Sequence, residues 1–371
     1  MNNVLALIDL YDGGELGLLT NEKPLASTTF LGRYAFIDFV LSNLSNSGID
    51  QIGVLVKNHA NSIYKHISNT NTYLANPKTG SLNLLINEKG ILNPVFNTDL
   101  NNIRENDYLL YDDNIQYVLV TNSSFIMKID YKQIIKEHIN SGKAVSLVYK
   151  NVDDTTEFAD CLRVVSDSLN NVQKIYKSKA KESTGIVLNT MVIDRKLFLD
   201  LIKKINTLSV VYNMDDLATY LANFVTQVNL IEYKGIVKYF DSFKKYYRYS
   251  LDFLNDEKLM NDYFNDPKWT FYTTTHDSRP VMYGEKAKVS NSLISNGSTI
   301  LGTVKNSIIS RDVVIEEGAS VENSIIFTHC VIKKGVSIKN VVADKRVVFA
   351  NREEVFGTTE EPLYFPRGVN V

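Results

Sequence analysis

The sequence predicts two domains, an α/β domain on the amino-terminal side and a parallel β-helix on the carboxyl-terminal side. Over residues 1–250, short apolar runs alternate with longer amphipathic stretches, which is typical of a sheet wound with helices. After Pro280 the pattern changes, and single apolar residues recur at every sixth position. We therefore predict an α/β domain over 1–250, a linker over 251–280 and a β-helix over 281–371.

In the α/β domain, strands are predicted where apolar residues form short runs, and helices where they recur three or four positions apart. The predicted strands cover 4–10, 52–56, 117–120, 144–149 and a run from Ile186, and the predicted helices cover 37–46, 62–67, 131–141, 194–204 and 245–254. The runs VLAL, IGVLV and VSLVY lack alternation, as expected for a parallel sheet covered on both faces. Gly142 is a predicted C-cap. Residues 69–114 are rich in Asn and Asp, and no secondary structure is predicted for this insertion.

The β-helix is predicted from a period of six with one apolar residue in each repeat. The repeating residues fall into three phases: Ile294 and Ile300; Ile309, Ile315 and Val321; Ile326, Ile332 and Ile338. Three repeats form one triangular coil, so each of these side chains should point into a shared core. Small turn-forming residues punctuate the series at Gly284, Gly297, Gly302, Gly318 and Gly335. We expect the breaks in phase to lie at the corners of coils.

Composition excludes several classes of protein. The net charge of −2 over 371 residues lacks the basic excess of a nucleic-acid binder. Cys161 and Cys330 lie far apart and match no metal-ligand spacing, which favours reduced thiols over a disulfide framework. Asp9 interrupts the short apolar run at the amino terminus, and no basic segment precedes that run, so a buried strand is predicted in place of a signal peptide. No stretch reaches the roughly 18 apolar residues that span a bilayer. We expect a cytoplasmic protein.

Residues 32–49 read GRYAFIDFVLSNLSNSGI, and this segment resembles the core signature of ADP-glucose pyrophosphorylases, the glucose-1-phosphate adenylyltransferases. The resemblance extends to the KIDY run at 128–131, the aromatic-rich helix at 245–254 and the terminal hexapeptide repeats. It implies a Rossmann-like, GT-A-type nucleotidyltransferase domain followed by a left-handed β-helix. In that family a sugar phosphate is joined to the α-phosphate of a nucleoside triphosphate, and pyrophosphate is expelled.

The phosphate-binding loop of the family departs from its pattern in this chain. Family members carry Gly-Gly-x-Gly-x-Arg-Leu, and the stretch here, residues 10–16, reads LYDGGEL. Gly13 and Gly14 remain as a vestige of the loop, and Glu15 stands at the arginine position. A carboxylate about 4 Å from a phosphate charge costs roughly 1–4 kcal/mol at effective dielectrics of 80 to 20. We expect nucleotide binding in the family's usual pose to be impaired.

The two aspartates that hold the metal in the family also differ here. The family pattern Gly-Asp-His before Tyr-Lys-Met-Asp-Tyr places the first of them at Ser124. The Asp-Val-Gly-Thr pattern places the second at Tyr239 when Ser242 matches the threonine, whereas a slip of two residues would place Asp241 there. Asp130 is predicted to cap the following helix. The family's sugar-binding Glu-Lys-Pro has no clear counterpart in 175–179.

These departures resemble the non-catalytic regulatory subunit found in the family. The resemblance implies a hetero-oligomer, a tetramer with a catalytic subunit, for bacterial glycogen synthesis. No cofactor is expected in this chain, since Mg²⁺ and ATP would belong to the catalytic partner. A sugar-phosphate effector is a further expectation, and the candidate residues are Arg33, Lys345, Arg346 and Arg352. The alternative for these four is that they are solvated surface cations.

Two other interpretations remain open. The chain could be an active nucleotidyltransferase with a displaced metal site built from Asp9, Asp12 or Asp241. It could also be a β-helix acyltransferase or a metabolite-binding module, since His329 falls within the repeats.

Overall fold

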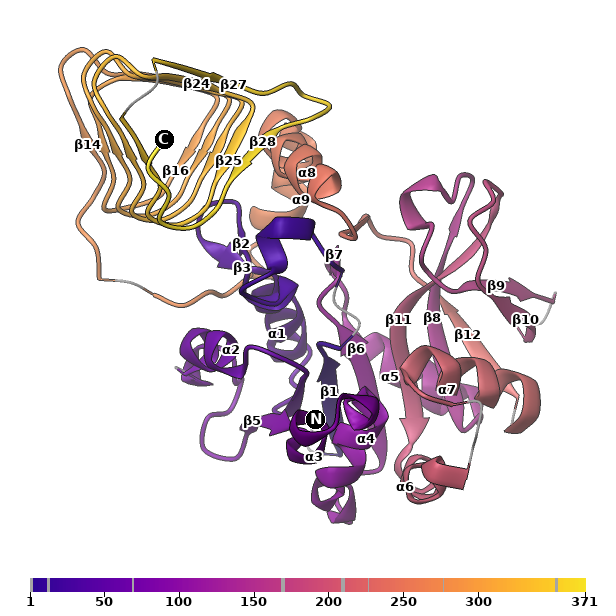
Figure 1. Ribbon diagram of the computed structural model, residues 1–371. Coiled ribbons are helices and arrows are strands. Elements are labelled where there is room, and N and C mark those ends of the chain that lie inside the picture. The colour runs from indigo at the N-terminus through magenta and orange to yellow at the C-terminus, as the bar shows by residue number, and fades with distance from the viewer. Residues whose placement is uncertain are drawn as a thin grey trace. The chain divides into compact units, whose positions relative to one another are not determined.

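The computed structural model describes residues 3–11, 14–68, 70–167, 171–207, 211–225, 227–275, 277–350 and 353–371 (Figure 1). The chain forms two compact units. The first unit comprises Met1–Gly13 and Phe39–Tyr239, and the second comprises Gly14–Asp38 and Phe240–Val371. The predicted division at residue 250 therefore differs from the observed one, because an early segment and the aromatic-rich helix belong to the unit that contains the solenoid.

The first unit is built on a mixed sheet. Its main path runs β10-β9-β11-β6-β1-β4-β5, and β8 pairs with both β11 and β12. The strands are β1 Val4–Asp9, β4 Gln51–Val56, β5 Ser81–Ile86, β6 Tyr117–Asn122, β8 Val145–Val152, β9 Arg163–Ser166, β10 Val172–Tyr176, β11 Thr184–Asp194 and β12 Val228–Glu232. β1 lies parallel to β4 and β6, as predicted. The strand β11 instead runs antiparallel to both β6 and β8, whereas the VSLVY strand β8 is parallel to β12, so the expectation of a parallel sheet fails at β11. A strand that is buried on both faces has a continuous apolar sequence whether its neighbours are parallel or antiparallel. The apolar runs therefore could not predict the direction of pairing.

The helices before residue 221 are α1 Phe36–Asn46, α2 Ala60–Ile67, α3 Glu88–Leu92, α4 Asp99–Glu105, α5 Tyr131–Ser141, α6 Arg195–Lys204 and α7 Met214–Tyr220. Four of them, α1, α2, α5 and α6, follow the predicted apolar spacing, whereas the sequence predicted no helix at α3, α4 or α7. The caps of α5 confirm the sequence prediction. The side chain of Asp130 accepts a hydrogen bond from the Lys132 N–H, and Gly142 closes the helix at a φ of 64°. Among the described residues, no helix is long and apolar enough to cross a membrane.

The insertion at 69–114 is more regular than predicted. It contains β5, which pairs parallel with β4, together with α3 and α4. β5 is an edge strand whose first residues are only half-buried, so its SLNLLI sequence carries a weak periodic signal. The N-cap of α4 is Thr98, whose hydroxyl accepts a hydrogen bond from the Asn101 N–H. The polar residues that suggested irregular structure therefore include helix caps.

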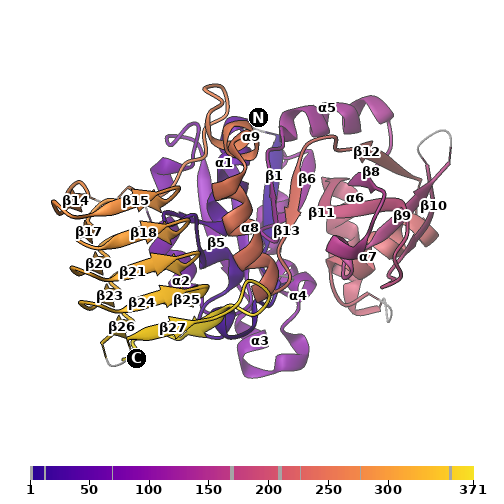
Figure 2. The ribbon, with the colours of Figure 1, turned by 90° about the horizontal axis from the view of Figure 1, so that it is seen from above.

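The second unit contains the predicted parallel β-helix, in which three sheets of five strands form the faces of the solenoid (Figure 2). One sheet comprises β14 Met282–Tyr283, β17 Thr299–Ile300, β20 Val314–Ile315, β23 Val331–Ile332 and β26 Val348–Phe349. The next comprises β15 Lys288–Ser290, β18 Thr303–Lys305, β21 Ser320–Glu322, β24 Ser337–Lys339 and β27 Glu354–Phe356. The last comprises β16 Leu293–Ile294, β19 Ile308–Ile309, β22 Ile325–Ile326, β25 Val341–Ala343 and β28 Leu363–Phe365.

The hexapeptide residues form inward columns, as predicted. Ile294, Ile309 and Ile326 occupy the same place in successive coils, so one coil takes 15 residues and the next 17. Asparagines mark one corner of each coil. Asn291, Asn306, Asn323 and Asn340 have positive φ values, between 41° and 51°. Their amides form a ladder in which Asn291 Nδ2 donates to Asn306 Oδ1 (2.9 Å) and Asn306 Nδ2 to Asn323 Oδ1 (2.7 Å). Asparagine tolerates this left-handed backbone better than other residues with a side chain beyond Cβ.

An aromatic cluster completes the second unit. Phe30, at the end of β2 Thr29–Phe30, contacts the rings of Phe36, Phe240 and Phe253 at centroid distances of 5.3, 5.4 and 5.5 Å. β2 pairs with β3 Tyr34–Ala35, and the cluster continues into α8 Phe243–Asn255 and α9 Glu257–Phe264. The predicted linker at 251–280 therefore contains the end of one helix and all of another. Aromatic side chains supply the buried surface there, so the segment folds although it contains few aliphatic residues.

Candidate ligand pocket and the family metal positions

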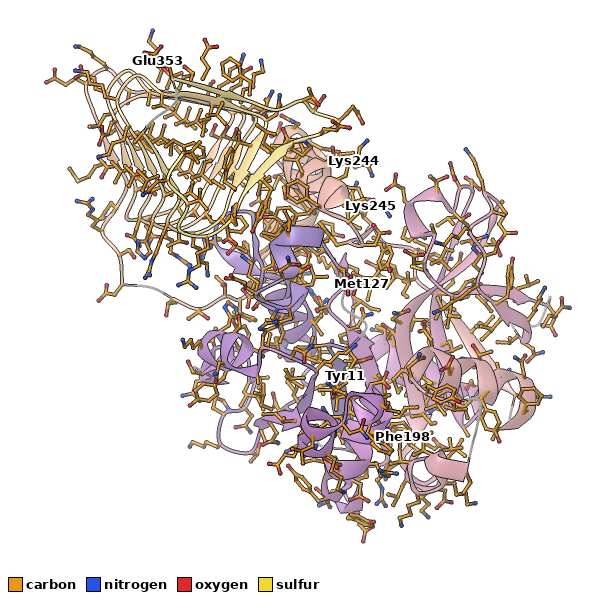
Figure 3. The ribbon with its side chains drawn as sticks, viewed as in Figure 1. Tyr11, Met127, Phe198, Lys244, Lys245 and Glu353 are labelled. Carbon is orange, nitrogen blue, oxygen red and sulfur yellow. The ribbon has the colours of Figure 1, made fainter. Side chains whose placement is uncertain are left out.

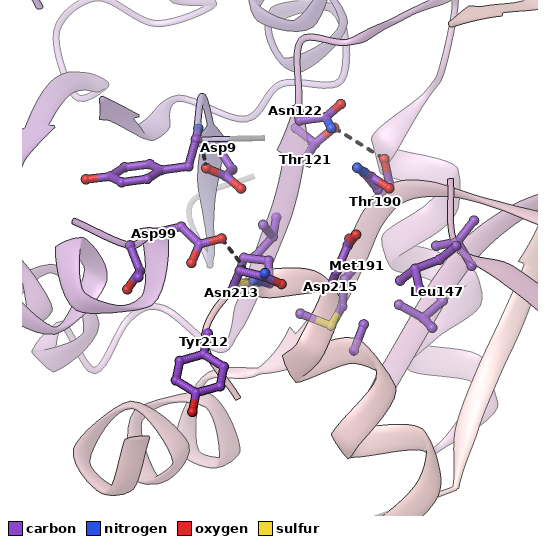
Figure 4. A pocket seen from close by; sticks show the side chains of 18 of the residues that line it. Asp9, Asp99, Thr121, Asn122, Leu147, Thr190, Met191, Tyr212, Asn213 and Asp215 are labelled. Carbon is purple, nitrogen blue, oxygen red and sulfur yellow. Dashed lines mark hydrogen bonds between the residues drawn. The ribbon is translucent and has the colours of Figure 1, made fainter. Parts of the chain in front are cut away.

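A cavity of about 310 Å³ lies within the first unit (Figure 4). Asp9 and Asn122 line it from the last positions of β1 and β6, which are parallel neighbours. The carboxyl ends of parallel strands are where α/β folds place their ligands. Asn189 and Thr190 reach the cavity from β11, where the register with β8 shifts between Val187 and Thr190. Such a bulge redirects side chains, and Asn189 has a φ of 44°.

Hydrogen bonds and an ion pair hold the polar lining in place. Asp99 accepts from the Leu100 N–H at 2.6 Å and from the Met214 N–H at 2.9 Å. Lys177 Nζ lies 2.8 Å from Asp215 Oδ2. By contrast, the Nδ2 of Asn122 is buried and has no hydrogen-bond partner among the described residues. This amide can therefore donate to a ligand in the cavity.

Tyr11 contributes an uncharged hydroxyl to the same cavity (Figure 3). Its phenol oxygen accepts a hydrogen bond from Asn102 Nδ2 at 3.1 Å. Burial is the main cause that raises the pKa of Tyr11 to about 12, and the nearby carboxylate of Asp9 acts in the same direction. The phenol is therefore protonated at neutral pH and can serve as a hydrogen-bond donor.

A second cavity, of about 420 Å³, shares Lys177 and Asn189 with the first and adds Asp160, Lys179 and Tyr239 to the lining. Lys177 thus contributes to both cavities, although sequence reasoning found no counterpart for a sugar-binding lysine in residues 175–179. A lysine in a loop carries no spacing signal by itself. Its role in the pocket follows from where the ends of β10 and β11 lie in the sheet.

Ser124 and Tyr239, the residues that the resemblance assigns to the two metal positions, are brought close together by the pairing of two strands. β13 Val237–Tyr239 pairs antiparallel with β7 Phe125–Met127, and this pairing sets Tyr239 opposite Phe125, the residue after Ser124. The ring of Tyr239 stacks on Phe125 at 4.7 Å and lies 6.3 Å from Phe158. Ser124 is buried, and its N–H donates to Asn122 Oδ1 at 3.3 Å. Mg²⁺ takes oxygen ligands, usually one or two carboxylates, so a serine hydroxyl beside stacked rings does not fit it.

Of the loop residues and the proposed substitute aspartates, Gly14, Glu15, Asp9 and Asp241 fall within the described residues. Gly14 and Glu15 belong to the second unit, and Glu15 is exposed. A side chain at position 14 would collide with the Phe240 carbonyl oxygen, which lies 2.1 Å from an ideal Cβ. Close packing against the Phe240 backbone therefore requires glycine at this position.

Asp241 pairs with Lys245 of α8 at 2.5 Å (Figure 3). Asp9 accepts from the Tyr11 N–H at 2.9 Å. Gly13 and Asp12 lie outside the described residues.

The effector candidates fall into two groups in the second unit. Burial is the main cause that lowers the pKa of Lys345, and the charge of Lys23 is the next. The charges of Arg367 and Arg346 lower this pKa as well. Lys23 itself pairs with Asp344 at 2.8 Å. Sequence reasoning missed Lys23 and Arg367, because no spacing rule connects them to Lys345.

Arg33 lies in a different environment from Lys345. Its guanidinium carbon is 5.2 Å from the centroid of the Tyr34 ring, and its charge helps to lower the pKa of Arg311, for which burial is the larger cause. Arg352 lies outside the described residues. His329 sits at a coil corner, half-exposed, with its Nδ1 4.0 Å from Asp312 Oδ2.

Comparison with known proteins agrees with this architecture. A family model described as nucleotidyl transferase matches residues 13–175, and one described as GlmU-like, C-terminal hexapeptide, matches residues 278–361. The fold and these two matches define a nucleotidyltransferase-type protein with a hexapeptide-repeat β-helix.

Its relatives include a glucose-1-phosphate adenylyltransferase of Clostridioides difficile (strain 630), 28% identical over 83% of this chain and 81% of the relative. One from Fervidobacterium nodosum is also 28% identical, over 86% of this chain and 78% of the relative. One from Bacillus cereus (strain ATCC 14579) is 27% identical, over 83% and 82%. The chain is thus similar to glucose-1-phosphate adenylyltransferases over most of its length.

Proposed function

We propose that this chain is a non-catalytic regulatory subunit of glucose-1-phosphate adenylyltransferase. It would bind a catalytic subunit in a mixed tetramer in the cytoplasm and support ADP-glucose synthesis for glycogen. The observation that supports the proposal is the aromatic stack of Tyr239 on Phe125, next to Ser124. The resemblance assigns Ser124 and Tyr239 to the positions of the two metal-binding aspartates.

Electrostatics explains why this exchange would remove catalysis. Nucleotidyl transfer proceeds without a covalent enzyme intermediate, so the enzyme acts by positioning the substrates and neutralising phosphate charge. Ser124 and Tyr239 supply no negative charge for Mg²⁺. Glu15 carries a negative charge, whereas a triphosphate requires a positive one. Under the proposal, Mg²⁺ and ATP are bound by the catalytic partner.

The proposal is tested by assaying a catalytic subunit with and without this chain. We expect the chain alone to release essentially no pyrophosphate from ATP and glucose 1-phosphate, and the mixture to be more active, or to respond differently to metabolites, than the partner alone. Ser124→Ala and Tyr239→Phe are matched controls that keep the packing and should leave the effect on the partner unchanged. A partner whose rate and metabolite response are the same with and without the chain would contradict the proposal.

Regulation by a sugar phosphate is part of the same proposal. The cluster of Lys23, Lys345, Arg346 and Arg367 offers the cationic donors that a phosphate requires. We expect Arg346→Ala, in the mixed complex, to shift the activation curve for fructose 1,6-bisphosphate to higher concentration. Lys334→Ala, at an exposed position of the same solenoid, is the matched control. An unchanged activation curve for Arg346→Ala in an intact complex would show that these residues are surface cations with no part in effector binding.

The alternative is an active nucleotidyltransferase that uses Asp9, Asp12 or Asp241. The ion pair between Asp241 and Lys245 disfavours it, because a lysine already balances that carboxylate. Mg²⁺-dependent turnover by the isolated chain, abolished by Asp9→Asn, would establish this alternative. Binding of acetyl-coenzyme A would instead favour an acyltransferase.

A further inference from the structure

The cavity of about 310 Å³ in the first unit offers both hydrogen-bond donors and hydrogen-bond acceptors (Figure 4). The donors are the buried Nδ2 of Asn122 and the protonated phenol of Tyr11. Asp9 and Asn189 carry acceptor oxygens on β1 and β11. A hydroxyl group both donates and accepts hydrogen bonds, so a lining of this kind matches the neighbouring hydroxyl groups of a sugar ring.

Part of the lining is apolar, which also suits a sugar ring. Leu147, Val187 and Met191 line the cavity from β8 and β11. The C–H groups of a sugar ring pack on such surface, while its hydroxyl groups need polar partners. The volume lies at the lower end of the range of about 300–1,000 Å³ for ligand pockets, which favours a single sugar ring over a complete sugar nucleotide.

Contacts among the lining residues hold the cavity in one shape. Asp99, next to the N-cap of α4, accepts a hydrogen bond from the Met214 N–H at the start of α7 (2.9 Å). Thr121 Oγ1 lies 3.2 Å from Thr190 Oγ1 and links β6 to β11. Side chains that are already ordered lose little conformational entropy when a ligand binds. A small ligand can therefore gain affinity here from a few hydrogen bonds.

The charges of the lining determine which sugars it accepts. The carboxylates of Asp9, Asp99 and Asp215 line the cavity together with two lysines, Lys57 and Lys177. Lys177 pairs with Asp215 at 2.8 Å, and Lys57 is exposed to solvent, where water weakens its attraction for an anion. The lining therefore carries more negative than positive charge, which repels a phosphate group.

We propose that this cavity binds an uncharged sugar and disfavours the phosphorylated form of the same sugar. The resemblance to nucleotidyltransferases implies the reverse preference, because their substrate is a sugar phosphate. The inference rests on the charges and hydrogen-bonding groups of the cavity and does not depend on the proposed regulatory function. The cationic cluster that we propose for a sugar-phosphate effector belongs to the second unit and is a different site.

The test is saturation-transfer NMR of glucose on the full chain, with glucosamine and glucose 1-phosphate as competitors. We expect glucose to bind, and glucosamine, which carries a positive charge, to displace it at a concentration no higher than that of unlabelled glucose. Glucose 1-phosphate should need a concentration at least about 10-fold higher. Because competition reports only the site that holds glucose, a phosphate bound to the second unit does not affect the comparison.

Two variants locate the glucose site in the cavity. Asn122→Asp keeps an oxygen for the Ser124 N–H but replaces the donating amide, so it should weaken glucose binding at least about 10-fold. Glucosamine should be affected less, because the added carboxylate attracts its ammonium group. Tyr11→Phe is a milder second variant that removes only the donor hydroxyl. The matched control is Asn140→Asp, the same substitution at an exposed position of α5, which should leave binding unchanged.

Circular dichroism and melting temperature would verify that each variant is folded, and Tyr11→Phe decides the question if Asn122→Asp is not. The proposal is overturned if glucose shows no saturation transfer in the tens of millimolar, or if glucose 1-phosphate displaces glucose more readily than glucosamine does. Wild-type glucose binding in both cavity variants would also overturn it, as would an equal loss in Asn140→Asp. None of these results bears on the activity of a catalytic partner, which tests the regulatory proposal separately.

Discussion

His138 links three elements of the first unit from a buried position on α5. Its Nδ1 lies 2.8 Å from Ser146 Oγ of β8, and its Nε2 lies 3.4 Å from Asp194 Oδ1 at the end of β11. Burial is the largest cause that lowers the pKa of His138, and it outweighs the opposite influence of Asp194. The folded protein therefore holds this imidazole neutral more strongly than the unfolded chain does.

We expect His138 to make the stability of the first unit depend on pH. Because its pKa is lower in the folded state, its stabilising contribution is present above the unfolded value of about 6.5 and is lost as the pH falls through the folded value. Urea unfolding at pH 7.5 and pH 5.5 measures the effect. The wild type should lose more free energy of unfolding between these pH values than His138→Gln, and an equal loss in both would contradict the assignment.

Lys23 and Asp344 form a largely buried ion pair within the second unit. Their side chains are 12% and 9% exposed, and the Tyr364 hydroxyl also lies 3.1 Å from Asp344 Oδ2. Burial lowers the pKa of Lys23, while Asp344 acts to raise it. A pair of this kind contributes little net free energy when whole, but breaking it leaves one charge buried without its partner.

We expect Lys23→Met to lower the free energy of unfolding of the second unit by about 3 kcal/mol. The double variant Lys23→Met/Asp344→Leu should recover much of that loss, because it removes both charges. Thermal or urea unfolding of the single and double variants checks this. If the double variant is no more stable than Lys23→Met, the ion pair does not explain the loss.

Helix α5 is capped at its start by the side chain of Asp130. Asp130 Oδ1 accepts from the Lys132 N–H at 2.9 Å and lies 3.5 Å from the Ser47 hydroxyl. We expect Asp130→Ala to cost about 1 kcal/mol in the free energy of unfolding, and Asp130→Asn, which retains a cap, to cost less. Similar losses for both variants would show that the carboxylate charge matters and the capping oxygen does not.

The inward columns make the solenoid sensitive to single substitutions. Ile315 and Val321 are 0% exposed, and each continues a column through the coils above and below. We expect Ile315→Asp to cost several kcal/mol, because it buries an unpaired charge, and to abolish folding of residues beyond Pro280 together with binding to the catalytic partner. Ile315→Val, which keeps the column apolar, should cost only about 0.5–1.5 kcal/mol. A stable mixed oligomer containing Ile315→Asp would contradict the role of the column.

For the complete chain, the decisive measurement is turnover without a partner. Loss of one electrostatic donor costs about 10²–10³ in rate, and Glu15, Ser124 and Tyr239 together change three charged positions. We therefore expect pyrophosphate release at least about 10³-fold slower than in active relatives. Mg²⁺-dependent turnover at a rate like theirs, with contaminating enzyme excluded, would refute the regulatory proposal.

Local patterns were enough to predict much of this architecture. The spacing of Ile309, Ile315 and Val321 specified a hexapeptide solenoid, because each coil repeats the same short-range geometry. Helices such as α5 were predictable from apolar spacing and from caps that lie next to them in sequence. The similarity to nucleotidyltransferases was readable from the motif in residues 32–49, which keeps its order and spacing.

Long-range pairing decided what the sequence pattern left open. The direction of β11, the inclusion of β5 in the sheet and the division into two units all depend on partners distant along the chain. The stack of Tyr239 on Phe125 joins residues on β13 and β7, and Lys23 meets Asp344 across 321 positions. Local periodicity records which face of an element is buried, but it carries no information about which distant element covers that face. For this reason the residue types at the family metal positions were readable from the sequence, whereas the aromatic packing between them and the adjoining cavities that share Lys177 emerged from the folded chain.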